Sequence, residues 1–243
     1  MSILTQPHSL RQLAGQFLDE LLPACCLLCG ADSGKHLLCP ACADDLPLLP
    51  AALCPQCSLP TTFGERCGAC LHEPPHFDTT LALFRYDFPV DRIVHALKYG
   101  HQLAVAEWLG DTLAARLAGQ TFELIVPLPL HAQRLAERGF NQAVEIAAHL
   151  EKHLKIPVDR YSLQRTRATP AQAELPLKER HKNVRGAFEC RSDFSGRHLL
   201  LLDDVMTSGA TANECARVLK LHGAASVTVA VAARALKHSA RHS

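Results

Sequence analysis

The chain has 243 residues, of which 48% are hydrophobic, so it is long enough to bury the core of one medium-sized domain together with a small one. Its 25 basic and 24 acidic residues give a formal net charge of +1. The chain as a whole therefore has no electrostatic attraction for nucleic acid or for a membrane surface, and any such binding must be local. The sequence contains no apolar run of transmembrane length and no signal-peptide pattern at its start. We therefore expect a cytoplasmic protein without a membrane span.

Residues 1–24 are predicted to contain an amphipathic helix. Ser9–Gln12 fits a capping box, the apolar residues that follow fall on one helical face, and Pro23 ends the pattern. We expect this face to pack on the rest of the chain. Binding to a partner or to a membrane surface is the less favoured alternative, because the polar face is not basic.

Residues 25–73 hold nine of the eleven cysteines, and eight of them form two copies of one spacing. Each cysteine of the second copy lies 28 positions after its counterpart in the first. The predicted ligands are Cys26, Cys29, Cys39, Cys42, Cys54, Cys57, Cys67 and Cys70. Zinc takes four thiolates tetrahedrally, and each CxxC knuckle supplies two of them. The pattern predicts a double zinc ribbon with two structural zinc ions, with Cys25 left over.

Two alternatives stay open for these cysteines. Disulfides or an iron–sulfur cluster are the competing chemistry, disfavoured by four CxxC knuckles in register. Consecutive knuckles could share a metal, which is the simpler geometry, or the arrangement could be cross-braced.

Residues 76–236 alternate strands and helices after the linker Pro74-Pro75, which predicts a parallel α/β sheet. Strands are expected at residues 79–86, 122–126, 199–202 and 226–232, with helices at 90–100 and 103–118, after Gln142 and after Gly209. Residues 163–188 are rich in Arg and Lys and lack apolar periodicity, which indicates a long, basic, mobile loop with a functional role. A solvated connector is the alternative. Residues 237–243 form a polar tail.

The stretch Leu199–Thr211 joins a buried strand to paired carboxylates, Asp203 and Asp204, and then to a turn rich in hydroxyl groups. A turn that opens a helix presents unpaired N–H groups, so Thr207–Thr211 can hold a phosphate. The adjacent carboxylates can accept hydrogen bonds from vicinal ribose hydroxyls and attract a hard divalent cation. Dinucleotide and ATP signatures are absent. The alternative is an ordinary turn whose Asp and Thr residues cap the helix.

This stretch resembles the phosphoribosyl-pyrophosphate (PRPP) loop of type I phosphoribosyltransferases, in which the acidic pair holds the ribose hydroxyls and the turn holds the 5′-phosphate. Ser208 departs from that pattern, since many members have Thr there, but it keeps a hydroxyl. The resemblance implies PRPP contacts with Asp203, Asp204, Thr207, Ser208, Gly209, Ala210 and Thr211. It also implies Mg²⁺ bound with PRPP by Asp203 and Asp204.

PRPP also carries a pyrophosphate and so requires a second anion pocket. Arg134 and Arg138 can supply guanidinium forks, with Lys98 as a further cation, and Arg180 and Arg185 could close over the site. Six motifs in this order resemble the ComF family: Lys98-Tyr-Gly100, Val126-Pro-Leu-Pro129, Arg138-Gly-Phe-Asn-Gln142, Arg165-x3-Thr169-x2-Gln172, Arg180-x2-Asn183-x2-Gly186-Ala-Phe188 and the PRPP loop. The resemblance implies a type I phosphoribosyltransferase fold behind a zinc ribbon and a role in handling incoming DNA.

Two functions are compatible with these motifs. The first is an Mg²⁺-dependent phosphoribosyltransferase with Asp203, Asp204, Arg180 and Arg185 as its catalytic residues and an unspecified acceptor. The second is a non-catalytic PRPP-fold module whose zinc ribbon docks single-stranded DNA or a DNA-uptake helicase. The ribbon has few basic or aromatic residues, among them Lys35, Phe63 and Arg66, so its affinity for DNA is not evident from sequence.

Overall fold

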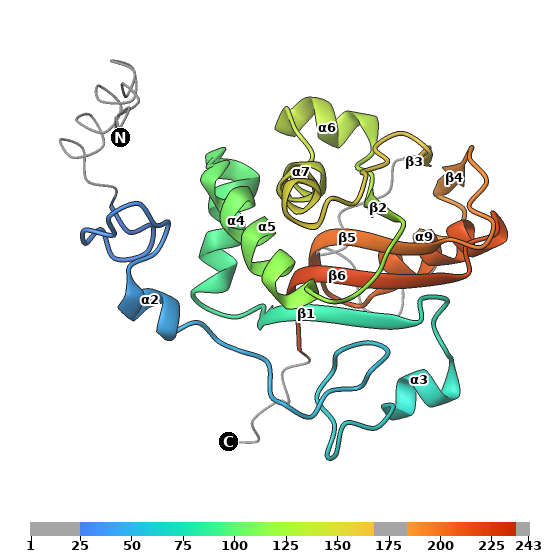
Figure 1. The fold of residues 1–243 in the computed structure, drawn as a ribbon, viewed down its shortest axis with the longest axis horizontal. Helices are drawn as coiled ribbons and strands as arrows, with labels where there is room; N and C mark the ends of the chain where they lie inside the picture. Colours follow the sequence, from blue (N-terminus) through green and yellow to red (C-terminus); the bar gives the residue numbers. More distant parts are fainter. Residues whose placement is uncertain (1–24, 168–183, 237–243) are drawn as a thin grey trace, which may run out of the picture. The chain divides into compact units, whose positions relative to one another are not determined.

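The computed structural model describes residues 25–167 and 184–236 (Figure 1). The chain divides between Leu46 and Pro47 into two compact units. The helix predicted within residues 1–24, the polar tail and Arg180 lie outside the described residues. Within the part of the chain that the structure describes, no helix is long and apolar enough to cross a bilayer.

The two cysteine repeats fold alike but belong to different units. The first contains α2 (Pro40–Asp44) and the second contains α3 (Gly68–His72), 28 residues later. Each short helix starts directly after a cysteine, Cys39 or Cys67, with nearly identical backbone angles. The first repeat lies before the division at Leu46, and the second lies after it, in the unit that contains the sheet.

The second unit is built on a parallel sheet of four strands in the order β1-β6-β5-β2 (Figure 1). These strands are β1 (Thr79–Arg85), β2 (Leu124–Pro127), β5 (His198–Met206) and β6 (Ser226–Arg234). The leucines 199–202 are fully buried, as expected for a central strand covered on both faces. The predicted parallel α/β sheet is confirmed.

Helices cover both faces of this sheet. On one face, α4 (Val90–Gly100) leads into α5 (Ala104–Leu117), and α5 packs against α7 (Gln142–Leu154). On the other face, α9 (Ala210–Leu221) packs on β5 and β6 (Figure 1). Helix α5 approaches α7 closely at Gly110, where a Cβ atom would lie 2.5 Å from Cβ of His149. Glycine is therefore required at this crossing.

Strand β5 is longer than predicted, and its additional residues include the two carboxylates of the candidate site. The prediction ended the strand at Leu202, but pairing with β6 continues through Asp203 to Met206. Strand β2 ends at Pro127, opposite Leu202. Beyond Leu202, β6 is the one described strand that pairs with β5. The backbone of Asp203 and Asp204 therefore stays in the sheet, while their side chains can reach an open cavity.

Two further predictions need correction. Helix α6 (Ala132–Arg138) occupies a stretch for which no helix was predicted; it is short and carries no buried residue, so its sequence shows no apolar stripe. The segment 163–188 is not irregular at its ends, because β3 (Leu163–Arg165) and β4 (Phe188–Cys190) pair antiparallel. Burial of Leu163 and Phe188 anchors this pair. Residues 168–183 lie outside the described residues.

Candidate functional site

A cavity of about 420 Å³ lies at the carboxyl ends of the strands. Its walls come from α4, α6, the start of α7, β3 and the end of β5 with the turn that follows. Seven of the residues predicted to bind PRPP line it: Lys98, Arg134, Arg138, Asp203, Asp204, Thr207 and Thr211. The strand ends of an open α/β sheet are where ligands bind in such folds, and the structure brings these predicted residues together there.

The two carboxylates have different environments. Asp204 is buried, and its Oδ2 lies 2.5 Å from Nζ of Lys98, on the last turn of α4. Its Oδ1 accepts a longer hydrogen bond of 3.4 Å from Nε2 of Gln142. Asp203 is partly exposed to the cavity, and its Oδ1 accepts a hydrogen bond from the Asp204 amide. Asp203 is therefore the carboxylate that faces an incoming ligand.

The charges of this cluster shift pKa values in opposite directions. Burial raises the pKa of Asp203, and the neighbouring Asp204 carboxylate raises it further. Burial alone would also raise the pKa of Asp204, but the charge and hydrogen bond of Lys98 outweigh it and lower that pKa. For Lys98 the attraction of Asp204 likewise outweighs burial, so its pKa is raised. At neutral pH the pair Lys98–Asp204 is ionised, and Asp203 is the group that a cation would stabilise.

A hydrogen-bonded chain connects this pair to the arginine wall. Gln142 accepts a 2.7 Å hydrogen bond from Nη1 of Arg138 and donates to Asp204. The Arg138 guanidinium lies over the ring of Tyr99, 5.3 Å from its centroid. The predicted pyrophosphate fork is thus held in place by α4 and α7 before any ligand arrives.

Arg134 and Arg165 extend the positive wall of the cavity. Arg134 projects from α6 and Arg165 from β3. Burial lowers the pKa of Arg165, and the nearby charge of Arg134 lowers it further. Two cations held together in this way favour a multiply charged anion between them.

The turn after β5 has the form expected of a phosphate site. Gly209 caps α9 in the left-handed region with φ of 81°, and the Ser208 hydroxyl accepts a hydrogen bond from the Ala210 amide. Asp203, Thr207 and Thr211 line a small hollow of about 30 Å³ beside this turn. The N-terminus of a 12-residue helix therefore opens next to the carboxylates.

Arg185 does not lie in this cavity. It lines another, of about 610 Å³, with Glu214 and Arg217 of α9. There the Glu214 carboxylate accepts a hydrogen bond from the Gly186 amide and forms an ion pair with Arg217. Arg185 is therefore separated from the site to which the sequence prediction assigned it.

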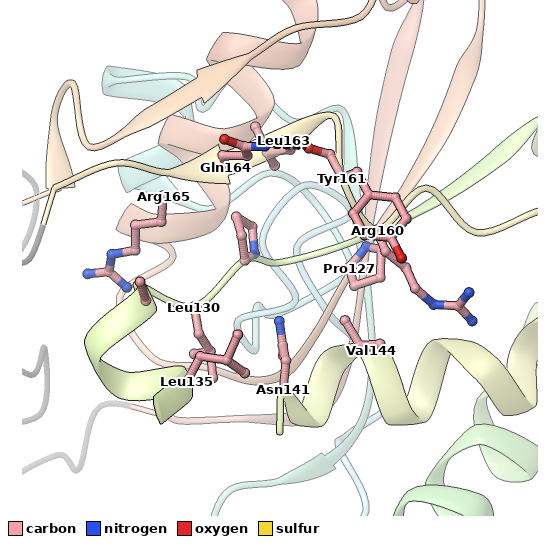
Figure 2. A pocket seen from close by; sticks show the side chains of 12 residues that line it. Pro127, Leu130, Leu135, Asn141, Val144, Arg160, Tyr161, Leu163, Gln164 and Arg165 are labelled. Carbon is pink, nitrogen blue, oxygen red and sulfur yellow. Dashed lines mark hydrogen bonds between the residues drawn. The ribbon is translucent and has the colours of Figure 1, made fainter. Parts of the chain in front are cut away.

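An apolar cavity of about 460 Å³ adjoins the charged one and shares Pro129, Leu130 and Arg165 with it (Figure 2). Leu135 of α6 and Val144 of α7 form one side, and Leu163 of β3 lies across from them (Figure 2). Arg165 and Arg160 lie at opposite ends. Such walls suit an uncharged group rather than a phosphate.

The eight predicted zinc ligands gather in two sets, in consecutive order. The ligand atoms of Cys26, Cys29, Cys39 and Cys42 all lie within 4.8 Å of one another, and so do those of Cys54, Cys57, Cys67 and Cys70. The consecutive pairing is thereby confirmed, and the cross-braced alternative is wrong. Equivalent sulfur pairs are 3.7 Å apart in the first set and 3.6 Å in the second. Tetrahedral zinc with Zn–S of about 2.3 Å requires about 3.8 Å.

In each set the backbone favours the thiolate form of one cysteine, whereas the neighbouring thiols raise the pKa of Cys42, and burial raises that of Cys57. Burial opposes ionisation of Cys26, but the backbone N–H groups of Cys29 and Cys39 lower its pKa to about 6. Its counterpart Cys54 behaves in the same way, with a pKa lowered to about 7 despite its burial. Both sets therefore fit structural zinc. The hard oxygens of Asp203, facing the cavity, fit Mg²⁺.

The parallel sheet with a carboxylate pair and a hydroxyl-rich turn at its strand ends is a type I phosphoribosyltransferase fold. Residues 135–242 match the phosphoribosyl transferase domain family, and residues 17–71 match the double zinc ribbon domain family. The chain belongs to the ComF family, as its relatives show.

Two curated relatives carry this assignment. The chain is 36% identical over 185 residues to the DNA utilization protein YhgH of Escherichia coli K12, covering 73% of this chain and 82% of that protein. It is 30% identical over 212 residues to Competence protein F of Haemophilus influenzae, covering 83% and 92%. Among solved structures, adenine phosphoribosyltransferase from Thermoanaerobacter pseudethanolicus matches with a TM-score of 0.34 and 17% identity, over 57% of this chain and 72% of that one.

Three residues of the site were not assigned a role from sequence. Gln142 and Arg165 occur in the family motifs, but nothing in their spacing indicates that they meet Asp204 and Arg134. Arg234 is the last residue of β6, two residues beyond the end of the strand predicted at 226–232, and the sequence assigned it no role. Contacts between residues so far apart depend on the sheet order, which the sequence alone does not fix.

Proposed function

We propose that this protein binds PRPP with Mg²⁺ and transfers its phosphoribosyl group to an acceptor. The observation that carries the proposal is the arrangement around the charged cavity. A carboxylate pair and a phosphate turn lie on β5 and α9, and arginines from α6 and β3 lie in the same cavity. The carboxylates suit the diol of a ribose, the turn suits one phosphate, and the arginines suit a pyrophosphate.

In the proposed mechanism the turn Thr207–Thr211 binds the 5′-phosphate, and Asp203 accepts hydrogen bonds from the ribose hydroxyls. Arg134 and Arg138 bind the pyrophosphate and stabilise the negative charge that develops on it. Mg²⁺, held by Asp203 with Asp204 behind it, would neutralise further charge on the leaving group. Lys98 keeps Asp204 ionised.

The proposed reaction is a substitution at C1 of the ribose. A nucleophilic atom of the acceptor forms a bond to C1 of the ribose, while the C1–O bond to pyrophosphate breaks and its electron pair leaves with the pyrophosphate. The acceptor gives up its proton to solvent. Preorganised arginines would stabilise the charge without moving, because Arg138 is already held by Gln142 and Tyr99.

The biological setting comes from the relatives. Their names assign them to DNA utilisation and competence, and we propose the same role for this chain. Two thiolate zinc sites require a reducing compartment, which supports a cytoplasmic location. The alternative is a non-catalytic PRPP-fold module. Its ribbon would contact single-stranded DNA or a helicase, and the exposed Phe63 and Leu71 of the second repeat favour such a contact.

One assay separates these functions. The protein is incubated with PRPP, Mg²⁺ and a panel of bases, amines and DNA ends, and pyrophosphate release is measured next to PRPP affinity by calorimetry. We expect binding, with turnover for one class of acceptor. Binding without turnover for any acceptor would favour the binding module. Absence of PRPP binding would contradict both proposals.

A further inference from the structure

Arg234 is a buried cation that joins the second zinc ribbon to the phosphate turn. It is the last residue of β6 and only 3% exposed. Its Nε donates to the carbonyl oxygen of Cys57 at 2.8 Å. Its Nη1 donates to the carbonyl oxygens of Met206 at 2.9 Å, Ala235 at 2.8 Å, and Thr207. One guanidinium thus bonds a knuckle of the second four-cysteine site and the first residues of the turn.

Buried packing also joins the second four-cysteine site to the turn. Cys54, Cys57 and Cys70 belong to the same buried core as Met206 and Ala210. The Met206 side chain lies against the turn, where a Cβ on Gly209 would come within 2.7 Å of its Cε. A displaced knuckle would therefore displace the side chain on which the turn rests.

Polar side chains of the second repeat fasten it to the first strand. Ser58 donates from Oγ to the carbonyl oxygen of Thr80 at 2.6 Å, and Thr80 donates from Oγ1 to the carbonyl oxygen of Gln56 at 2.7 Å. Gln56 donates in turn to the carbonyl oxygen of Phe77 at 3.2 Å. The second repeat is therefore fixed to the sheet on two sides, at β1 and at Arg234.

A zinc ion held by the second four-cysteine set would give the charge of Arg234 a counter-charge. Among the residues that the structure describes, it has no carboxylate within ion-pair distance. Four carbonyl groups satisfy its hydrogen bonds but not its charge. Four thiolates around one Zn²⁺ carry a net charge of about −2, and hydrogen-bonded neighbours tune such centres. A buried guanidinium is the complementary neighbour.

We propose that Arg234 is a positioning residue that couples occupancy of the second four-cysteine site to the conformation of the phosphate turn. The first four-cysteine site, in the other compact unit, serves as its natural control. Because coupling between two sites is reciprocal, a ligand bound at the turn should also raise the affinity of the second four-cysteine site for its metal. This inference goes beyond the proposed reaction, and only its ligand-binding test depends on the proposed function.

The first experiment does not require any ligand. Amide hydrogen exchange of residues 205–212 is compared in the full chain for wild type, Cys67→Ser and Cys39→Ser, which alter equivalent ligands of the two sites. We expect exchange in the turn to rise about fivefold or more in Cys67→Ser, the lower end of usual coupling strengths, and to stay unchanged in Cys39→Ser. The variant Cys67→His keeps four zinc ligands and should restore protection. Equal exchange in all four proteins would overturn the proposal.

The second experiment tests Arg234 itself through zinc release to a colorimetric chelator. Ribose 5-phosphate is the probe, because the pyrophosphate of PRPP would bind zinc. In wild type, we expect ribose 5-phosphate to slow release from one of the two sites, and Cys67→Ser to identify that site as the second. In Arg234→Lys, which keeps the charge but not the fork, the slowing should disappear while both zinc ions still bind.

The possible outcomes of this experiment are distinguishable. Slowing that persists in Arg234→Lys, or that acts on the first site, would contradict the proposal. If Arg234→Lys does not fold, the comparison of Cys67→Ser with Cys39→Ser still decides whether the second four-cysteine site is coupled to the turn. If wild type binds no ribose 5-phosphate, the proposed function fails, and the hydrogen-exchange result alone decides the coupling.

Discussion

Nζ of Lys98 lies 2.5 Å from Oδ2 of Asp204, in a pair whose side chains are 20% and 3% exposed. This pair joins α4 to β5 at the floor of the cavity. It places a fixed positive charge behind the carboxylate that is not facing the ligand, so Asp203 is left to meet the cation and the ribose.

Removal of one member of this pair should be costly. Lys98→Met leaves a buried carboxylate without its partner, and we expect a loss of about 3–5 kcal/mol in the free energy of unfolding. The double variant Lys98→Met/Asp204→Asn should recover much of that loss. Chemical denaturation measures both. A small effect of the single variant would mean that Asp204 is neutral in the folded protein.

Asp203 should destabilise the ligand-free protein at neutral pH. Its pKa is raised above the ordinary 3.8 by burial and by the Asp204 carboxylate. The folded state therefore holds this proton more tightly than the unfolded chain. The resulting stability is present below pH 3.8 and is lost as the pH rises through the raised folded value. Asp203→Asn should raise the melting temperature at pH 7, and this gain should vanish on acidification. A gain of the same size at every pH would contradict this prediction.

The same carboxylates should be required for binding. In the double variant Asp203→Asn/Asp204→Asn we expect PRPP affinity in the presence of Mg²⁺ to fall by roughly 2–4 kcal/mol, the size of lost charge-assisted contacts. Calorimetry measures this loss. Asp91→Asn is the matched control, since Asp91 lines the same cavity and its carboxylate accepts a hydrogen bond from the neighbouring Arg92 amide. Unchanged affinity in the double variant would contradict the PRPP site.

Variants of the proposed pyrophosphate pocket and of the proposed 5′-phosphate turn should affect PRPP and ribose 5-phosphate differently. Arg138→Ala removes a fork held by Gln142 and Tyr99, and should weaken PRPP by roughly 1.5–3 kcal/mol while ribose 5-phosphate binds almost as before. Thr211→Val should weaken both ligands modestly, since the backbone donors of the turn remain. Equal losses for both ligands in Arg138→Ala would show that this arginine has a structural role only.

The chain should contain two zinc ions. Metal analysis of the purified protein should give two per chain, and Cys39→Ser should lower this to one without changing the melting of the sheet-containing unit, because Cys39 lies in the other unit. Iron in place of zinc, or no metal, would contradict the prediction. Zinc content unchanged in Cys39→Ser would show that three ligands suffice.

Periodicity and spacing predicted much of this molecule. Helix α4 has the predicted bounds, and the cysteine ligands were identified by their repeat alone. The carboxylates and the turn were predicted because they are neighbours in sequence. What the sequence could not indicate are contacts across the sheet. Lys98 reaches Asp204, and Arg234 reaches Cys57, only because β1 and β5 both neighbour β6.

Arg185 illustrates what the composition of a segment cannot indicate. Its place in a basic segment suggested a role in the charged cavity. The side chains of one basic segment can, however, lie in different cavities. The backbone at Gly186 bonds Glu214 of α9 and brings Arg185 to another cavity. Composition predicted the charge of the segment and could not predict where each side chain would lie.

The two cysteine repeats differ at the residue after the first knuckle, where the first has Gly30 and the second has Ser58, both with positive φ. A serine is strained in this region, whereas glycine is not. The strain persists at Ser58 because its hydroxyl bonds the backbone of β1, a contact that a glycine could not make. The repeat in the sheet-containing unit thus has an anchoring hydroxyl where the other repeat has the less strained glycine backbone. Exchange of these two residues between the repeats should therefore relax the second backbone but remove its Ser58 hydrogen bond to β1, and should leave the first repeat with strain and without that compensating bond.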